Sequence, residues 1–206
     1  MSSEQITDNS EQGTENKGKR GLKTVRDGNR RSLVTATLLI VNYSLLIELR
    51  GCMIYRVYID TSIVGGYFDD MFADDTMALF KRMEKKELIF IISSVLRQEL
   101  NQAPDNVRKL LDQFDKTCFE YVELTEEAIE LADRYIAEKV VGKTSVNDCR
   151  HIAIATLNKA DVLASWNFRH IVNLERIKGY NGVNLKCGYS VIEIRSPKEL
   201  LKYGNK

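Results

Sequence analysis

The sequence predicts an α/β fold with three layers (α/β/α), built on a central parallel sheet of four to five strands. Short apolar runs rich in β-branched residues alternate along the chain with longer stretches of helical periodicity. Only two prolines occur in 206 residues, as expected of regular elements with short connections. Strands that alternate with helices are typical of parallel sheets covered by helices on both faces.

Apolar runs mark the expected strands. The first, residues 56–59, leads directly into Asp60-Thr61-Ser62, and Gly65-Gly66 is then expected to loosen the chain. Further strands are expected at residues 88–92, 119–123 and 162–164, with a candidate fifth at 191–194.

Helical patterns fill the intervals between the strands. One begins at Asp74, and another follows a cap at Ser93 or Ser94 and stops at Pro104. Further helices are expected at residues 106–116, at 126–140 after a Thr125 cap, and at 146–158, where Ser145 and Asp148 form an S-x-x-D start signal.

Composition excludes several classes of protein. Hydrophobic residues make up 44% and charged residues 29%, with a net charge of +1, which is an ordinary globular mixture. No strong overall field draws the chain to nucleic acid or acidic lipid. The four cysteines form no CxxC pair and only two histidines occur, so a zinc site of the usual spacing is not expected.

The chain divides into two parts at about Met53. Residues 1–52 form a polar, basic extension with a short apolar segment at 32–47, which is shorter than the ~20 residues that span a bilayer. We interpret this part as an extension outside the fold, with a membrane anchor as the weaker alternative. Residues 53–206 form the expected domain, for which we predict a cytoplasmic location without membrane attachment.

Polar residues follow the predicted strands where a parallel sheet places its ligands. Asp60 comes directly after the first strand, and Glu99 lies one turn into the helix after the second. Asp148 lies in the first turn of a later helix, and Asn167 follows the fourth strand. By contrast, Asp161 precedes the fourth strand, so it is expected at the opposite edge with no role.

Three converging carboxylates repel one another unless a cation neutralises them. Hard oxygen ligands favour Mg²⁺ or Mn²⁺, which also contact substrate phosphates and activate water. Asp60, Glu99 and Asp148 are therefore predicted catalytic and metal residues. The hydroxyls of Thr61 and Ser62 are predicted to support the site by orienting Asp60 or a metal-bound water. The plain alternatives are a turn cap for Asp60 and a helix start for Asp148.

Four segments together resemble the PIN-domain family of metal-dependent nucleases, including VapC-type toxins of bacterial and archaeal toxin–antitoxin pairs. They are residues 57–62 (VYIDTS), 94–100 (SVLRQEL), 147–155 (NDCRHIAIA) and 164–168 (ASWNF). The resemblance covers residues 54–196. It implies a PIN-like α/β/α fold and cleavage of RNA by water with Mg²⁺ or Mn²⁺.

The fourth acidic position of that family is matched here by Asn167, which offers a neutral carbonyl oxygen as a fourth metal ligand. This departure lowers the charge of the predicted site from −4 to −3. Candidate RNA contacts lie beside the acids. They are Arg97, Arg150 and Arg169 for phosphate, and Trp166 for base stacking, with a place in the core as the alternative for the tryptophan.

The sequence thus predicts an Mg²⁺- or Mn²⁺-dependent endoribonuclease, the toxin of a toxin–antitoxin pair. The alternative is a weak or inactive PIN-like module that binds RNA or a protein. Expected partners are the RNA substrate, an antitoxin protein and a second copy of the chain in a homodimer.

Overall fold

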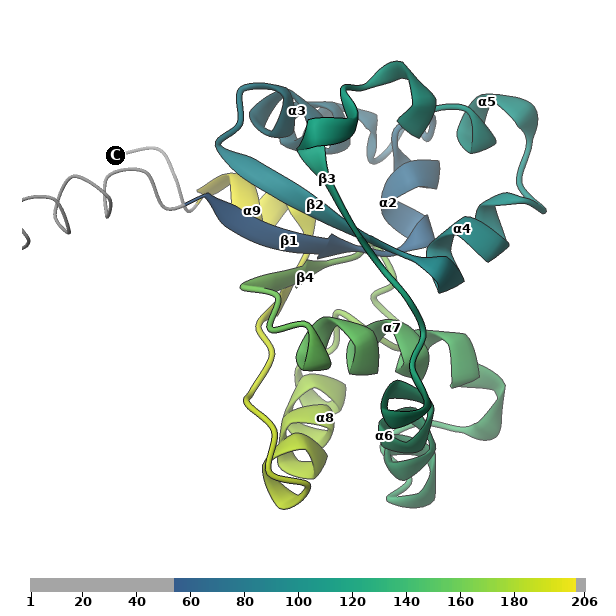
Figure 1. The fold of residues 1–206 in the computed structure, drawn as a ribbon, viewed down its shortest axis with the longest axis vertical. Coiled ribbons are helices and arrows are strands. Elements are labelled where there is room, and N and C mark those ends of the chain that lie inside the picture. Colours follow the sequence, from purple (N-terminus) through teal and green to yellow (C-terminus); the bar gives the residue numbers. More distant parts are fainter. Residues whose placement is uncertain (1–53, 203–206) are drawn as a thin grey trace, which may run out of the picture. The chain divides into compact units, whose positions relative to one another are not determined.

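A five-stranded parallel sheet forms the centre of the structure, a computed structural model that describes residues 54–202 (Figure 1). The strand order is β3-β2-β1-β4-β5, and every neighbouring pair is parallel. The sheet confirms the predicted fold class. Its strands are β1 (Tyr55–Ile59), β2 (Leu88–Ser93), β3 (Phe119–Val122), β4 (Val162–Ala164) and β5 (Ile194–Arg195).

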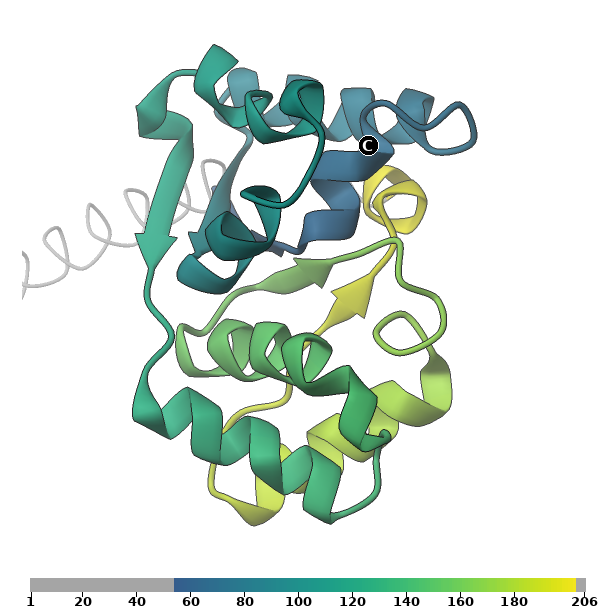
Figure 2. The ribbon, with the colours of Figure 1, turned by 90° about the vertical axis from the view of Figure 1, so that its right-hand side faces the viewer.

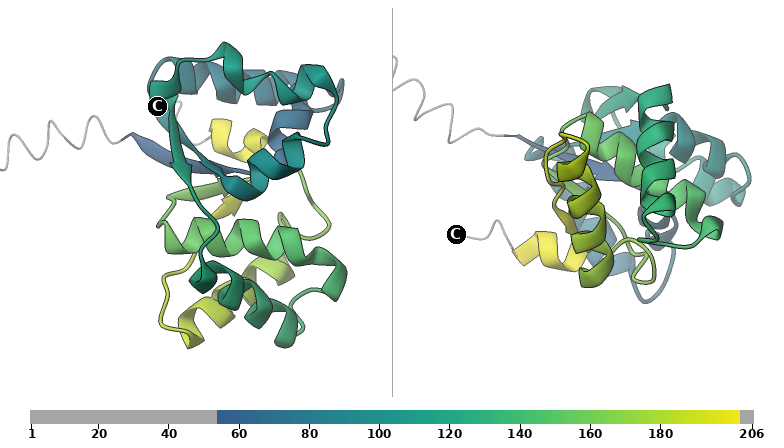
Figure 3. Two further views of the ribbon diagram at one scale, coloured as in Figure 1. Left: turned by 45° about the vertical axis from the view of Figure 1, so that its right-hand side comes forward. Right: turned by 90° about the horizontal axis from the view of Figure 1, so that it is seen from below.

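Helices cover both faces of this sheet, and the views in Figures 1, 2 and 3 agree on the layers. One face carries α2 (Thr61–Gly66), α3 (Ala73–Glu84), α5 (Asp105–Arg108) and α9 (Pro197–Lys202). The other carries α6 (Glu126–Ala137), α7 (Val146–Leu157) and α8 (Leu174–Lys186). The short helix α4 (Ser94–Leu100) lies where β2 ends.

Alternation along the strands divides the core into two halves. Tyr58 and Leu163 pack in the half that contains α6, α7 and α8, whereas their neighbours Val57 and Val162 pack in the half that contains α3. Successive strand residues point to opposite faces, so a strand buried on both faces reads as a continuous apolar run. That run is the signal that predicted the strands.

Two of the three predicted helix caps are present as hydrogen bonds. Ser93 Oγ accepts from the Leu96 amide at 3.1 Å, and Thr125 Oγ1 accepts from the Ala128 amide at 3.2 Å. Ser145 does precede α7, but its side chain makes no capping bond, because it closes a 3₁₀ turn (Lys143–Ser145) that feeds into the helix. The S-x-x-D signal therefore predicted the position of this helix start, although the start is formed by a 3₁₀ turn and not by a capping hydrogen bond.

The prediction that Gly65-Gly66 loosens the chain was wrong. Both glycines are helical and form the C-terminal end of α2, whose N-cap is Asp60. A Cβ on Gly66 would lie 2.7 Å from Trp166 Cδ1, so this glycine allows the helix to approach the indole. Glycine is used here for close packing.

Two helical segments also differ from expectation. Residues 106–116 do not form one helix: α5 is followed by two 3₁₀ turns, Leu111–Gln113 and Lys116–Cys118, because Phe114 is extended and the Asp115 carboxylate accepts from the Thr117 amide. Helix α8 was not predicted. Its interior Gly179 and Gly182 weaken the helical signal, although Gly179 packs closely against Val140.

No helix in the part of the chain from residue 54 to residue 202 combines the length and the apolar character that crossing a bilayer needs. The predicted extension, residues 1–52, lies outside the described residues. The proposed anchor segment at 32–47 lies outside them as well.

Candidate functional site

The carboxyl edge of the sheet gathers the predicted acids. Asp60 follows β1 directly, and Ser165 follows β4, which pairs with β1. A path of hydrogen bonds runs from Asp60 Oδ2 to Ser165 Oγ (2.7 Å), from that oxygen to the Asn167 amide (2.9 Å), and from Asn167 Nδ2 to Asp148 Oδ1 (3.0 Å). Residues separated by up to 107 positions thus meet at one edge.

Asp60 is buried, with 4% exposure, and both of its carboxylate oxygens are occupied. Ser62 Oγ donates to Oδ1 at 2.6 Å, and the Ile63 amide donates to the same oxygen at 3.3 Å. Burial raises the pKa of this carboxyl above its usual range, although His151 and the two serines oppose the rise. Ser62 therefore contacts Asp60, the acid that the sequence paired it with.

Glu99 is partly buried, and its carboxylate has three protein contacts. Its carboxylate accepts from Thr61 Oγ1 and from Asn147 Nδ2 (2.8 Å), and His151 Nε2 lies 3.1 Å from Oε2. Burial raises the pKa of Glu99, but the bonds from His151, Thr61 and Asn147 outweigh it, and the net pKa is lowered. Thr61 thus supports Glu99, whereas the sequence had placed it with Asp60 or a water.

Asp148 lies in the first turn of α7 and is half-buried. Burial raises the pKa of this carboxyl, and the charges of His170 and His151 counteract the rise. Asn167 donates to Asp148 through Nδ2, while its carbonyl oxygen accepts from the His170 amide at 3.0 Å. Asn167 therefore orients Asp148, and its carbonyl oxygen is occupied within its own loop.

The chemistry of this donor set suits a hard divalent cation, because it consists of carboxylates, hydroxyls and an amide. Burial raises the pKa of two of the three carboxyls, Asp60 and Asp148, because it disfavours their ionised forms. Added positive charge would favour those ionised forms. As the side chains lie, however, residues 54–202 contain no group of three His, Cys, Asp or Glu arranged to hold one metal ion. Binding one ion would therefore require these carboxylates to lie closer together than they do now.

The sequence missed several members of this cluster. Ser165 and Asn147 each contact a predicted acid directly, and His170 has a buried Nδ1 with no partner among the described residues. Ser165 had a usable signal, since it is the first residue after β4 at the same edge as Asp60. Asn147 had none, because its contact depends on how α7 packs beside α4.

The predicted RNA contacts lie in different settings. Arg169 is exposed, Arg150 bonds weakly to Asn147 at 3.4 Å, and Arg97 pairs with Glu123 at 2.5 Å. Trp166 is only 8% exposed, and it belongs to the core in this structure.

The indole of Trp166 stacks on Phe72 with ring centroids 4.4 Å apart, and Nε1 donates to Thr76 Oγ1 at 2.9 Å. One face and the polar edge of the indole are thereby engaged by α3 and the residues before it. This is the core alternative that the sequence left open.

The pH dependence of stability offers a test of the buried Asp60 carboxyl. Its folded pKa is raised, so its contribution is full below the unfolded pKa of about 3.9 and is lost as pH rises through the folded value. In EDTA, we expect Asp60→Asn to gain thermal stability relative to wild type as pH rises from about 4 to 7. A Tm difference that is constant across this range would contradict the assignment.

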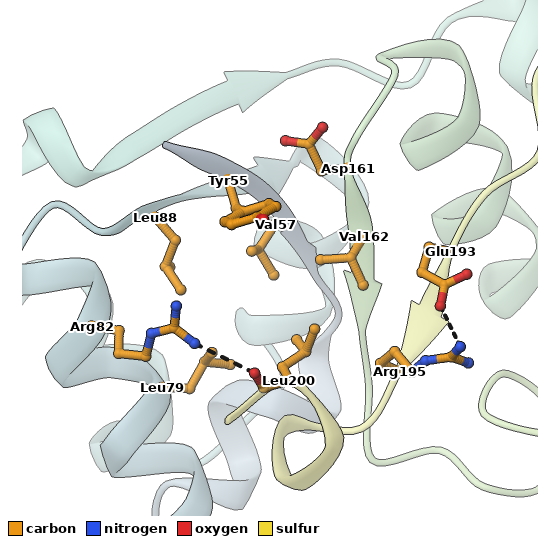
Figure 4. Close-up of a pocket in the computed structure, with 10 residues that line it drawn as sticks. All are labelled: Tyr55, Val57, Leu79, Arg82, Leu88, Asp161, Val162, Glu193, Arg195 and Leu200. Carbon is orange, nitrogen blue, oxygen red and sulfur yellow. Dashed lines mark hydrogen bonds and ion pairs between the residues drawn. The ribbon is translucent and has the colours of Figure 1, made fainter. Parts of the chain in front are cut away.

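A cavity of about 200 Å³ lies at the opposite edge of the sheet (Figure 4). It is lined by apolar residues from β1, β2, β4, α3 and α9, together with two acids, Asp161 and Glu193, and two arginines. Asp161 accepts from the Arg56 amide at 2.7 Å, so it lies at the amino edge, as predicted. This cavity contains none of the predicted site residues.

Comparison with known proteins gives similarity in structure only. No protein-family model matches the chain, and no curated protein matches it in sequence. VapBC2 from Rickettsia felis, solved bound to a DNA fragment from its promoter, is similar with a TM-score of 0.45 and 14% identity, over 68% of this chain and 98% of that one. FitAcB from Neisseria gonorrhoeae is similar with a TM-score of 0.43 and 11% identity, over 69% and 98%. Because both TM-scores are below 0.5, the description of the fold rests on this chain's own sheet order and layers.

Proposed function

We propose that this protein is an Mg²⁺- or Mn²⁺-dependent endoribonuclease that hydrolyses RNA phosphodiester bonds. The observation that carries the proposal is the hydrogen-bonded path that joins Asp60 to Asp148 through Ser165 and Asn167 at the carboxyl edge of the sheet. Thr61, the neighbour of Asp60, links the same edge to Glu99. Acids that share an edge in this way are available to one substrate phosphate.

Asp60, Glu99 and Asp148 are the residues that would hold the ion. A bound divalent cation supplies positive charge to the phosphate and lowers the pKa of water. The protein's own residues supply orientation: Ser62 and Ser165 fix Asp60, Asn167 fixes Asp148, and the donors around Glu99 hold its carboxylate in a lowered-pKa, ionised form.

Phosphate affinity is assigned to the arginines nearest the acids. Arg150 is on α7 two residues after Asp148, and the exposed Arg169 follows Asn167 by two residues. Because the chain carries almost no net charge, RNA affinity must come from such local contacts. Arg97 contributes less, since Glu123 already pairs with it.

The test of this proposal is a cleavage assay on single-stranded RNA with purified protein in Mg²⁺, Mn²⁺ or EDTA. We expect cleavage in either metal and none in EDTA. RNA that binds the protein but remains uncut in both metals would contradict the proposal.

One observation favours an inactive RNA- or protein-binding module as the second candidate. Asn167 stands where an acid would add a fourth charge, and each carboxylate already has protein donors. The cleavage assay separates the two candidates, since this module binds RNA or a protein partner without cutting RNA.

We propose that the protein is a toxin that pairs with an antitoxin protein. We also propose that it assembles as a homodimer. The support is the motif resemblance in the sequence. Induced expression in a bacterial host should arrest growth, and Asp60→Asn should relieve the arrest. Equal arrest by both forms would contradict a toxic nuclease.

Asn167→Asp tests how the fourth position affects metal binding. The aspartate would lose the Nδ2 donor to Asp148 and place a second carboxylate beside it, 3.0 Å away in the present structure. We therefore expect a lower Tm than wild type in EDTA and a larger rise in Tm on adding Mn²⁺. A variant whose Tm responds to Mn²⁺ no more than wild type would contradict a metal site here.

A further inference from the structure

A chain of buried polar side chains leads from the core to Glu99. The Tyr58 hydroxyl donates to Ser93 Oγ at 2.7 Å and lies 2.7 Å from His151 Nδ1. The other ring nitrogen of His151 lies 3.1 Å from Glu99 Oε2. Tyr58 and Ser93 are fully buried and His151 is 2% exposed. Burial of so many polar groups is costly, and an apolar cluster would fill the same space without that cost.

These side chains come from the same three elements that carry the predicted acids. Tyr58 lies on β1, two residues before Asp60, and His151 lies on α7, three residues after Asp148. The serine is the N-cap of α4, the helix that carries Glu99. A fully satisfied network between the three elements fixes their relative positions more tightly than apolar packing does.

We propose that Tyr58 and His151 are positioning residues for Glu99. The inference rests on the proposed nuclease function, because it concerns the geometry of that site. The Glu99 side chain is 26% exposed, and its other neighbours, Thr61 and Asn147, lie nearer the solvent. His151 supplies its buried contact, and the tyrosine hydroxyl holds the imidazole ring in place. Sites of this kind need their reactive groups held within about 0.5 Å.

Tyr58→Phe tests the inference, because it removes one hydroxyl and leaves the ring. Tyr135→Phe is the matched control: Tyr135 is also fully buried, and its hydroxyl donates to Asn184 Oδ1 at 2.5 Å, away from the acids. Both variants should lower Tm. Only Tyr58→Phe should lower kcat, by about 10–100-fold, with KM changed less than about twofold. Equal kcat in the two variants would overturn the inference.

Two substitutions of His151 ask whether its contact with Glu99 matters. Gln retains an amide donor that can reach the carboxylate, whereas Leu retains none. We expect His151→Gln to keep more of the wild-type kcat than His151→Leu. Loss of the same size in both would mean that the imidazole serves only the core.

A thermal double-mutant cycle tests the contact without any assay of activity. If Tyr58 holds Glu99 through His151, the Tm loss of Tyr58→Phe combined with Glu99→Gln is smaller than the sum of the single losses. Tyr135→Phe combined with Glu99→Gln should be additive. Additive losses in both cycles would overturn the inference.

The cleavage results also separate this inference from the function on which it rests. A wild-type protein that cuts no RNA in either metal contradicts the proposed function, and the positioning role falls with it. A wild-type protein that cuts RNA, with Tyr58→Phe equally active, contradicts the positioning role alone.

Discussion

Asp60→Asn is expected to lower kcat/KM for metal-dependent RNA cleavage by at least about 100-fold, while the protein remains folded. The substitution removes one of three negative charges from the proposed metal site. Asparagine still accepts a hydrogen bond at an N-cap, so the bond that the Ile63 amide donates to the side chain of residue 60 can persist. One bond from Ser62 or Ser165 weakens, because the amide nitrogen cannot accept it.

Asp161→Asn is the control for this result. It makes the same change at the amino edge, where Asp161 accepts from the Arg56 amide and contacts none of the predicted acids. Initial rates on labelled RNA in Mg²⁺ and Mn²⁺, with melting curves for both variants, check the prediction. Cleavage by Asp60→Asn at the wild-type rate, or an equal loss in Asp161→Asn, would contradict the proposed site.

Trp166→Ala is expected to destabilise the protein by about 3–5 kcal/mol, the usual cost of truncating a buried aromatic side chain. The substitution would remove the stack on Phe72 and the bond to Thr76, and would leave a void beside Gly66. Urea unfolding followed by circular dichroism measures the change. RNA affinity of the folded fraction should stay close to that of wild type.

Phe168→Ala provides the comparison, since Phe168 is the next aromatic residue along the chain and is 50% exposed. We expect a loss of at most about 1 kcal/mol from it. If Trp166→Ala instead folded as stably as wild type and bound RNA more weakly, the indole would belong to the RNA-binding surface.

The positions of the first four strands and the edge that collects the acids could be read from the sequence. The fifth strand was expected at residues 191–194, but it is Ile194–Arg195. Runs such as residues 88–92 are apolar on both faces, and only a covered parallel sheet buries both. Once Asp60 and Asn167 follow such strands, parallel pairing brings them to one edge. The same rule predicted that Asp161 lies at the amino edge of the sheet, where the structure places it. These predictions succeeded because they depend on local pattern and strand direction.

Helix boundaries between the strands were less predictable. Residues 106–116 have a helical apolar pattern, and Leu110 is buried as that pattern requires, yet the backbone breaks into short turns. In α8 the reverse holds, since Gly179 weakens the local signal but allows close contact with Val140. Tertiary packing overrides weak local propensity in both places.

The sequence by itself determined which acids share an edge, because strand direction is a property of the chain's pattern. Only the tertiary structure decided which distant residues each acid contacts. Asp60 accepts a hydrogen bond from the hydroxyl of Ser165, 105 residues away, and Glu99 contacts His151, 52 residues away. Such bonds depend on ångström-scale packing between elements, and no spacing along the chain encodes that packing.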